Sequence, residues 1–381
     1  MANNNDNKVL NVPHLRFPEF SGEWKMCTIG ELTTKVGSGV TPRGGEAVYK
    51  TEGHPFVRSQ NVGLGNLLLD DIAFIDEETH LRQKSTELQF NDVLLNITGA
   101  SIGRSALVDK QIVGGNVNQH VCIIRTKENL VPSFICSFLL SNYGQRQIDS
   151  FQAGGNRQGL NFEQIKSIKI TIPSKDEQIK IAKLLRAIDE RIATQNKIID
   201  KLQSLIKGLR VCCMQRNGSD NVYLSEIAQI YQPQTISSAE LTEDGFLVYG
   251  ANGIIGKYKD YNHKTEQICI TCRGNTCGMV NYTKPMSWIT GNAMVINTDK
   301  YQDKVYKKYL YHYLSAYNFN SIISGSGQPQ IVRTPLEKLK ITLPTISEQK
   351  QKAMILDKIQ DKIDINHNVL NLYILQKQYL L

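Results

Sequence analysis

Residues 168–192 read IKITIPSKDEQIKIAKLLRAIDERI, and residues 339–363, which begin 171 positions later, read LKITLPTISEQKQKAMILDKIQDKI. Ten positions are identical without a gap, and in the first copy they are Lys169, Ile170, Thr171, Pro173, Glu177, Gln178, Ala182, Leu185, Ile188 and Ile192. A repeat of this length and period indicates two copies of a whole structural unit rather than a solenoid. The sequence therefore predicts a protein with an internal pseudo-two-fold repeat.

Each copy of the repeat begins a long helix. Ser174 and Glu177 form the pattern of a capping box, and Thr345 and Glu348 repeat it. Apolar residues then recur in steps of three and four, which is typical of a coiled-coil seam. In the first copy the seam runs through Ile181, Leu185, Ile188, Ile192, Gln195, Ile199, Leu202, Ile206 and Leu209; in the second it runs through Leu356, Ile359, Ile363, Asn366, Leu370, Tyr373, Lys377 and Leu380. We expect the two helices to pair antiparallel.

Gln195 and Asn366 are the central polar members of these two seams. In an antiparallel pair the midpoints of the helices meet, so the two amides are expected to lie close together. A polar pair in an apolar seam disfavours slipped registers. We therefore predict that these two residues fix the register of the helix pair, although both amides could instead point to solvent.

The rest of the chain alternates short apolar runs with Gly- and Asn-rich turns, which predicts strands. We divide the chain into a flexible segment (1–22), a β-rich domain (23–173), a long helix (174–216), a second β-rich domain (217–344) and a C-terminal long helix (345–381). The fold class is thus α+β. Within the two domains, residues 93–103 align with 268–278, Gly115-Asn116 with Gly291-Asn292, and 153–155 with 324–326.

Composition limits the function classes. The apolar fraction of 41% fits a globular protein, and the net charge of +8 favours an acidic partner such as nucleic acid or a membrane surface. Many basic proteins bind neither. We find no apolar run long enough to cross a bilayer and no signal sequence, so we expect a cytoplasmic protein whose eight cysteines are reduced.

The common catalytic motifs are missing from the sequence. The turns at Gly99–Gly103 and Gly274–Gly278 lack the Lys-Ser/Thr of a phosphate-binding loop. Cys269 and Cys272 have C-x-x-C spacing, but residues three apart in a strand face opposite sides, which is poor geometry for zinc. We therefore expect no catalytic residue, no metal and no cofactor in this chain.

Polar loop residues of the types that read bases are numerous. Arginine bonds guanine with two donors, and asparagine or glutamine bonds adenine. In the first domain the candidates are Arg43, Arg58, Gln60, Asn61, Arg104, Asn116, Asn118, Gln119, Asn156, Arg157 and Gln158; in the second they are Tyr249, Asn252, Lys257, Arg273, Asn275, Asn292, Gln328, Gln330 and Arg333. Surface solubility and turn formation are the alternative explanation for each of them.

Several stretches resemble type I restriction–modification specificity subunits in the order in which that family carries them. They are PHLRFPEFSGEW at 13–24, SGVTPR at 38–43, FVRSQNV at 56–62, GGNRQGLNFEQI at 154–165, YGANG at 249–253, RGNTCG at 273–278, GSGQPQI at 325–331 and LPTISEQK at 343–350. The resemblance implies two target-recognition domains that each read one half of a bipartite site in double-stranded DNA. It also implies that the helices set the half-site spacing and dock two methyltransferase subunits, while restriction and translocase subunits complete the complex.

Two other functions stay open on the sequence alone. The chain could be a stand-alone DNA-modifying enzyme with an unrecognised site, and modification of DNA by the purified chain would favour that. It could also be a coiled-coil adaptor without DNA contact, which an absence of DNA binding in the presence of partner subunits would favour.

Overall fold

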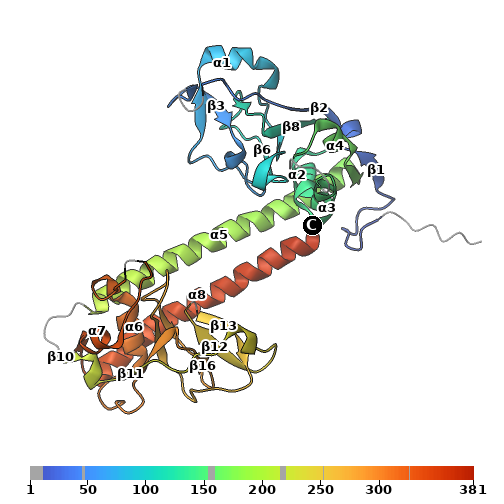
Figure 1. The fold of residues 1–381 in the computed structure, drawn as a ribbon. Helices are drawn as coiled ribbons and strands as arrows, with labels where there is room; N and C mark the ends of the chain where they lie inside the picture. The colour runs from blue at the N-terminus through green and yellow to red at the C-terminus, as the bar shows by residue number, and fades with distance from the viewer. Residues whose placement is uncertain (1–11, 45–47, 153–158, 215–219, 252, 326) are drawn as a thin grey trace, which may run out of the picture. The chain divides into compact units, whose positions relative to one another are not determined.

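The computed structural model describes residues 12–44, 48–152, 159–214, 220–251, 253–325 and 327–381 (Figure 1). The chain forms two compact units. The first contains residues 1–193 and 371–381, and the second contains residues 194–370. Each unit therefore includes one β-rich region together with part of each long helix. Within the described residues, no helix is both long and apolar enough to span a bilayer.

The first unit contains three small sheets. A two-stranded sheet pairs β1 (Lys25–Thr28) with β9 (Lys169–Ile172). The four-stranded sheet has the order β2 (Thr33–Ser38), β8 (Val121–Thr126), β5 (Val93–Asn96) and β6 (Ser105–Leu107). The three-stranded sheet has the order β4 (Ala73–Ile75), β3 (His54–Val57) and β7 (Asn116–Val117). Its short helices are α1 (Glu77–Arg82), α2 (Pro132–Leu140), α3 (Asn142–Ser150) and α4 (Phe162–Ser167). The main core joins one face of the four-stranded sheet to α2, α3 and α4.

The second unit repeats these sheets. A two-stranded sheet pairs β10 (Asp220–Tyr223) with β18 (Lys340–Leu343). The four-stranded sheet has the order β11 (Gln229–Tyr231), β17 (Ala293–Asn297), β14 (Ile268–Thr271) and β15 (Val280–Tyr282). The three-stranded sheet has the order β13 (Gly253–Tyr258), β12 (Phe246–Gly250) and β16 (Trp288–Ile289). Its short helices are α6 (Lys307–Ala316) and α7 (Arg333–Glu337). In both units the only pairing between parallel strands that we find in the described residues is in the three-stranded sheet, β3 with β7 and β12 with β16. The α+β class and the internal repeat are therefore confirmed.

The strand registers establish which residues are equivalent. Val93 pairs with Ile124 as Ile268 pairs with Ile296, which confirms the alignment of 93–103 with 268–278. The alignment of Gly115-Asn116 with Gly291-Asn292 is wrong. β7 corresponds to β16. The residue equivalent to Asn292 is His120, because the two carbonyl oxygens accept equivalent hydrogen bonds. Ile97 N donates to the His120 oxygen, and Cys272 N donates to the Asn292 oxygen, both at 3.0 Å. The connection from β15 to β16 is shorter than that from β6 to β7, so an alignment guided by the shared Gly-Asn misplaces the pair.

The long helices are α5 (Lys175–Met214) and α8 (Ile346–Leu380). In the second unit they share an apolar cluster of Leu202, Ile206, Leu209, Leu356, Ile359 and Ile363, and Lys352 Nζ donates to the Cys213 carbonyl oxygen at 2.9 Å. In the first unit Lys377 bonds Asp189 at 2.6 Å, and the guanidinium of Arg191 lies 5.8 Å from the ring centroid of Tyr373. Early residues of α5 thus meet late residues of α8, so the antiparallel pairing is confirmed.

The two capping boxes differ. Thr345 and Glu348 form the reciprocal pair of bonds, with Thr345 N donating to Glu348 Oε2 at 3.1 Å and Glu348 N to Thr345 Oγ1 at 3.4 Å. In the first copy Glu177 N donates to Ser174 Oγ at 3.4 Å, but the Glu177 carboxylate instead accepts bonds of 2.8 and 2.7 Å from Arg16. This ion pair links Arg16 to the start of the long helix, although Arg16 belongs to the segment 1–22 that the sequence predicts to be flexible. Residues 1–11 of that segment lie outside the described residues.

A fully buried glutamine joins each long helix to its β-rich region. Gln178 Oε1 accepts from Val131 N at 2.8 Å, and its Nε2 donates to the carbonyl oxygens of Asn129 and Pro173, both at 3.1 Å. Gln349 repeats the pattern: Oε1 accepts from Tyr306 N at 2.7 Å, and Nε2 donates to the carbonyl oxygens of Lys304 and Pro344 at 3.1 and 2.8 Å. In each unit, one side-chain amide thus bonds the start of the long helix to the segment that begins α2 or α6.

We predict that Gln349→Leu destabilises the second unit by about 2–4 kcal/mol, because buried backbone groups lose their hydrogen-bond partner while the side-chain volume changes little. Thermal unfolding and amide exchange at Tyr306 measure the effect. The control is Gln351→Leu, an exposed position on the same helix. Equal stability of the two variants would contradict this role of Gln349.

Candidate nucleic-acid interface

A glycine-bounded turn follows the central strand of each four-stranded sheet. Gly99 and Gly103 have φ values of 75° and 85°, and Gly274 and Gly278 have values of 85° and 91°. Glycine adopts this left-handed backbone without the strain that a Cβ would cause. Gly103 N donates to Asn96 O at 3.0 Å, and Gly278 N donates to Thr271 O at 2.8 Å. The interpretation of both G-x-x-x-G segments as tight turns is confirmed.

A second segment lies against each turn. Leu160 N donates to Ile97 O at 2.8 Å, and Ile331 N donates to Cys272 O at 3.0 Å. Isolated bridges continue these contacts, pairing Thr98 with Gly159 in the first unit and Arg273 with Gln330 in the second. In the second unit this brings together two residues that the sequence predicts to contact DNA. In the first unit Asn156, Arg157 and Gln158 lie outside the described residues, as does Asn252 in the second.

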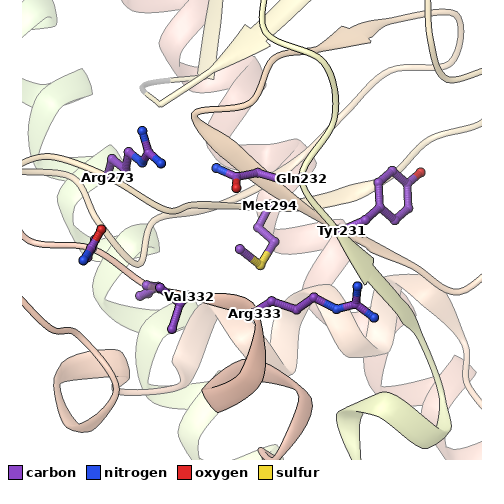
Figure 2. A pocket seen from close by; sticks show the side chains of 8 residues that line it. Tyr231, Gln232, Arg273, Met294, Val332 and Arg333 are labelled. Carbon is purple, nitrogen blue, oxygen red and sulfur yellow. The ribbon is translucent and has the colours of Figure 1, made fainter.

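Arg273 and Gln330 line a cavity of about 360 Å³ in the second unit (Figure 2). Its other lining residues are Tyr231, Gln232, Met294, Ile331, Val332 and Arg333. The Arg333 Nε is bonded to Glu337 at 2.7 Å, and the Gln232 Nε2 to the Gly291 carbonyl oxygen at 2.5 Å. The site therefore combines an apolar wall with two guanidinium groups and two amides, which suits a polar and electron-rich ligand.

Ten of the predicted site residues have exposed side chains: Arg43, Gln60, Arg104, Gln119, Arg273, Asn275, Asn292, Gln328, Gln330 and Arg333. Two others are half-buried and paired inside their own unit. Arg58 Nη2 donates to the Asp71 carbonyl oxygen at 2.6 Å, and Lys257 lies 3.5 Å from an Asp244 carboxylate oxygen. Among the exposed residues, Gln60, Gln119 and Arg333 already bond Asp71, His120 and Glu337, so the side chains of the other seven are the ones available to a partner.

Four predicted site residues are buried, and we remove them from the candidate interface. Asn61 bonds Arg58 N, Leu68 O and Asp71 at 2.9–3.0 Å, and it is fully buried. Asn116 is also fully buried and bonds His80, Gln83 O and Thr86 at 2.7–3.3 Å. The Asn118 side chain accepts from His120 N at 3.0 Å, and the Tyr249 hydroxyl accepts from Lys284 N at 3.2 Å. These polar groups stabilise loops from within.

Sequence reasoning missed Tyr231, Gln232 and Met294 as part of the cavity. Gln232 follows the end of β11. Only the sheet order, in which β17 lies between β11 and β14, brings that end near the turn after β14. The Y-Q-P-Q segment at 231–234 carries the general signal of a polar turn after a strand, but this signal does not identify the neighbouring turn.

The cysteines lie mainly in the cores. Burial raises the pKa of the Cys269 thiol to about 12, and it also raises the pKa of Cys272, whose Sγ lies 3.6 Å from the Gly291 carbonyl oxygen. All eight cysteines are free thiols. Among the described residues we find no group of three or more His, Cys, Asp or Glu side chains arranged to hold a metal ion.

Comparison with known proteins identifies the family. Residues 21–204 and 217–372 each match the model of the type I restriction modification DNA specificity domain, so the chain belongs to this family and carries two copies of the domain. Its function class is therefore that of a DNA-recognition subunit.

Individual relatives span nearly the whole chain. The type I restriction enzyme MjaVIII specificity subunit of Methanocaldococcus jannaschii is 24% identical over 92% of this chain and 88% of that protein. The S subunit of a type I restriction–modification system from M. genitalium has a similar fold, with a TM-score of 0.64, 17% identity and coverage of 94% of this chain and 95% of that one. A chain from a structural study of assembly and conformational transition of the type I R-M system matches with a TM-score of 0.59 and 16% identity over 97% and 98% of the two chains.

We predict that Asn116→Ala lowers the stability of the first unit by about 2–3 kcal/mol, because it removes the partners of three groups around a buried amide. Arg104→Ala, at an exposed position, should leave stability unchanged. Thermal unfolding of both variants tests this. If Asn116→Ala unfolds like the wild type but has lost DNA affinity, Asn116 belongs to the interface after all.

Proposed function

We propose that the chain is the non-catalytic specificity subunit of a type I restriction–modification complex. Residues 23–173 and 217–344 are its two target-recognition domains, and each reads one half of a bipartite site in double-stranded DNA. The helices at 174–216 and 345–381 set the half-site spacing and dock two methyltransferase subunits. Those subunits supply methyl transfer, and restriction subunits supply translocation and cleavage.

The observation that carries this proposal is that the two units share one backbone framework but have different side chains on the turns at its edge. The three sheets and the buried glutamine have the same topology and hydrogen bonds in both units. The residues on the turns differ, with the half-buried Thr98 standing where the second unit has the exposed Arg273. Two similar scaffolds with different exposed side chains suit the recognition of two different short sequences.

The charge of the chain supports DNA as the ligand. The net charge of +8 supplies the attraction to phosphate on which protein–DNA affinity depends. The exposed arginines and amides on the turns, among them Arg43, Arg104, Asn275 and Gln328, are the types that bond base edges and phosphates.

The pairing of the helices supports a role in spacing. Gln195 Nε2 donates to Asn366 Oδ1 at 2.5 Å and to the Asn366 carbonyl oxygen at 3.1 Å, so the expected contact between the two amides is present. Gln195 is only 8% exposed, and apolar layers containing Ile199 and Ile363 lie nearby in the seam. A shift by one heptad would place each amide against an apolar layer without a partner. We infer that this pair selects one register and hence one spacer length.

The decisive experiment is methylation mapping of genomic DNA from cells that carry this chain together with its modification subunits. We expect one motif with two specified halves and an unspecified spacer of fixed length. A continuous motif, or methylation that does not depend on this chain, would overturn the proposal. Methylation of DNA by the purified chain alone would favour a stand-alone enzyme instead.

We predict separable specificity. Arg104→Ala should alter recognition of one half-site, and Asn275→Ala should alter recognition of the other. A lost base contact costs about 1–3 kcal/mol at one base pair, whereas a lost phosphate contact weakens binding to all sequences alike. Methylation mapping of each variant complex provides the measurement. Equal changes at both half-sites from either variant would argue against two independent readers.

We also predict that changing Gln195 and Asn366 together to leucine raises the stability of the helix pair and weakens spacer discrimination. Two leucines can pack in the seam, but they no longer penalise a slipped register. The measurements are thermal unfolding and binding to duplexes whose spacer is one base pair longer or shorter. Gln195→Leu alone should be destabilising, because Asn366 Oδ1 then loses its donor. Unchanged spacer preference in the double variant would remove the register role.

A further inference from the structure

The positions that line the cavity of the second unit have equivalents in the first unit, and these carry different side chains. Because Ile124 and Ile296 are equivalent, the strand registers make Gly37 equivalent to Tyr231 and Ser38 equivalent to Gln232. The bridges make Thr98 equivalent to Arg273 and Gly159 equivalent to Gln330. Arg333, the first residue of α7, corresponds to Phe162, the first residue of α4. The first unit thus carries no cation at any of these five positions.

This difference bears on the ligand. The sugar–phosphate backbone is chemically the same at both half-sites, so residues that hold phosphates can be the same in both copies of a repeated reader. Residues that read base edges must differ wherever the half-site sequences differ. All five polar or aromatic cavity residues differ between the copies, although the backbone that carries them is the same. This pattern favours base readout over phosphate binding in the cavity.

Exposure and hydrogen-bond partners distinguish Arg273 from the other polar residues of the cavity. Arg273 is exposed, and we find no hydrogen bond or ion pair of its guanidinium within the described residues. By contrast, the charge of Arg333 is paired with Glu337, which weakens the cavity as a phosphate site. The amide nitrogen of Gln232 is occupied by the Gly291 carbonyl oxygen. Arg273 is therefore the cavity cation with all of its donors available.

Building on the proposed function, we propose that Arg273 reads a guanine in the half-site of the second domain and that Gln330 contacts the neighbouring base pair. Guanine presents two acceptors, O6 and N7, in the major groove, and the planar guanidinium bonds both at once. Residues paired across an antiparallel bridge have Cα atoms about 4.5–5.5 Å apart, and bases on one strand are about 3.4 Å apart. Two long side chains at this separation can reach successive bases. The equivalent residues Thr98 and Gly159 cannot form this pair of contacts.

The first test compares methylation motifs of the wild-type, Arg273→Ala and Arg273→Lys complexes with their modification subunits. In Arg273→Ala, preference for guanine at one position of the second half-site should fall by about 5- to 150-fold, the range that corresponds to one bidentate contact. Lysine retains the charge and can still donate to guanine but lacks the rigid fork, so Arg273→Lys should keep overall affinity and lose less of the preference than Arg273→Ala. Thr98→Ala, at the equivalent position of the first unit, should leave this guanine unaffected.

The second test replaces the mapped guanine in a synthetic duplex by 7-deazaguanine, which lacks the N7 acceptor and still pairs with cytosine. The wild-type complex should bind the substituted duplex more weakly than the natural one, whereas the Arg273→Ala complex should bind the two equally. Equal binding of the two duplexes by the wild-type complex overturns the inference even if a variant fails to fold.

The outcomes separate this inference from the proposed function. A bipartite wild-type motif with no guanine lost in Arg273→Ala overturns the inference and leaves the function standing. A uniform loss of binding to all sequences in Arg273→Ala, with a shallower salt dependence, identifies a phosphate contact and also overturns it. Absence of a bipartite motif in the wild type overturns the proposed function itself.

Discussion

The structure depends on a buried amide that accepts one backbone hydrogen bond and donates two. Gln178 and Gln349 each bind the backbone before a short helix and the carbonyl of the proline that precedes the long helix. A buried amide with fixed partners is costly to misplace, because every unpaired polar group loses its hydration without compensation. Each glutamine thus fixes the direction in which a long helix leaves its own sheets. Since the proline and the glutamine stand at the same spacing in both copies, the two units begin their helices in the same way.

Beyond this connection, the repeat preserves backbone geometry and varies side chains. The turn after β5 and the turn after β14 share positive φ at both glycines and the same closing hydrogen bond, so the backbone presents equivalent positions in both units. A rigid strand-and-turn frame holds exposed side chains at little cost to the core, which is why such positions can change without refolding the domain. Arg273 and Thr98 illustrate the result, since one bridge geometry carries a fork of donors in one unit and a hydroxyl in the other.

The sequence predicts what depends on short-range periodicity, and it fails where burial depends on distant segments. The seam spacing gives both long helices, because a strict pattern repeats after 171 residues. The antiparallel pairing follows from the chain path, since the first helix leads to the second domain and the second helix must return from it. The contact of Gln195 with Asn366 then follows from their places near the helix midpoints. The G-x-x-x-G turns follow from glycine alone. Asn116 is different, since its partners lie 30 to 36 residues away on the segment that contains His80. Glu177 likewise follows a capping pattern, yet Arg16, 161 residues away in the sequence, takes its carboxylate. No local rule distinguishes these buried groups from surface ones.

The contacts between helix and domain show how two similar units remain distinct. In the second unit burial lowers the pKa of His312, whose Nδ1 accepts from Arg210 at 3.2 Å while Nε2 donates to Asp357 at 3.0 Å. The equivalent residues in the first unit are Leu381, Ser137 and Arg186. There Leu380 and Leu381 line an apolar cavity of about 220 Å³ together with Trp24, Phe134, Phe138 and Leu185. An apolar helix end in place of Arg210 would leave the buried Nδ1 acceptor of His312 without a donor, at a cost of about 1–3 kcal/mol. Each domain therefore accepts its own pair of helix segments and disfavours those of the other copy.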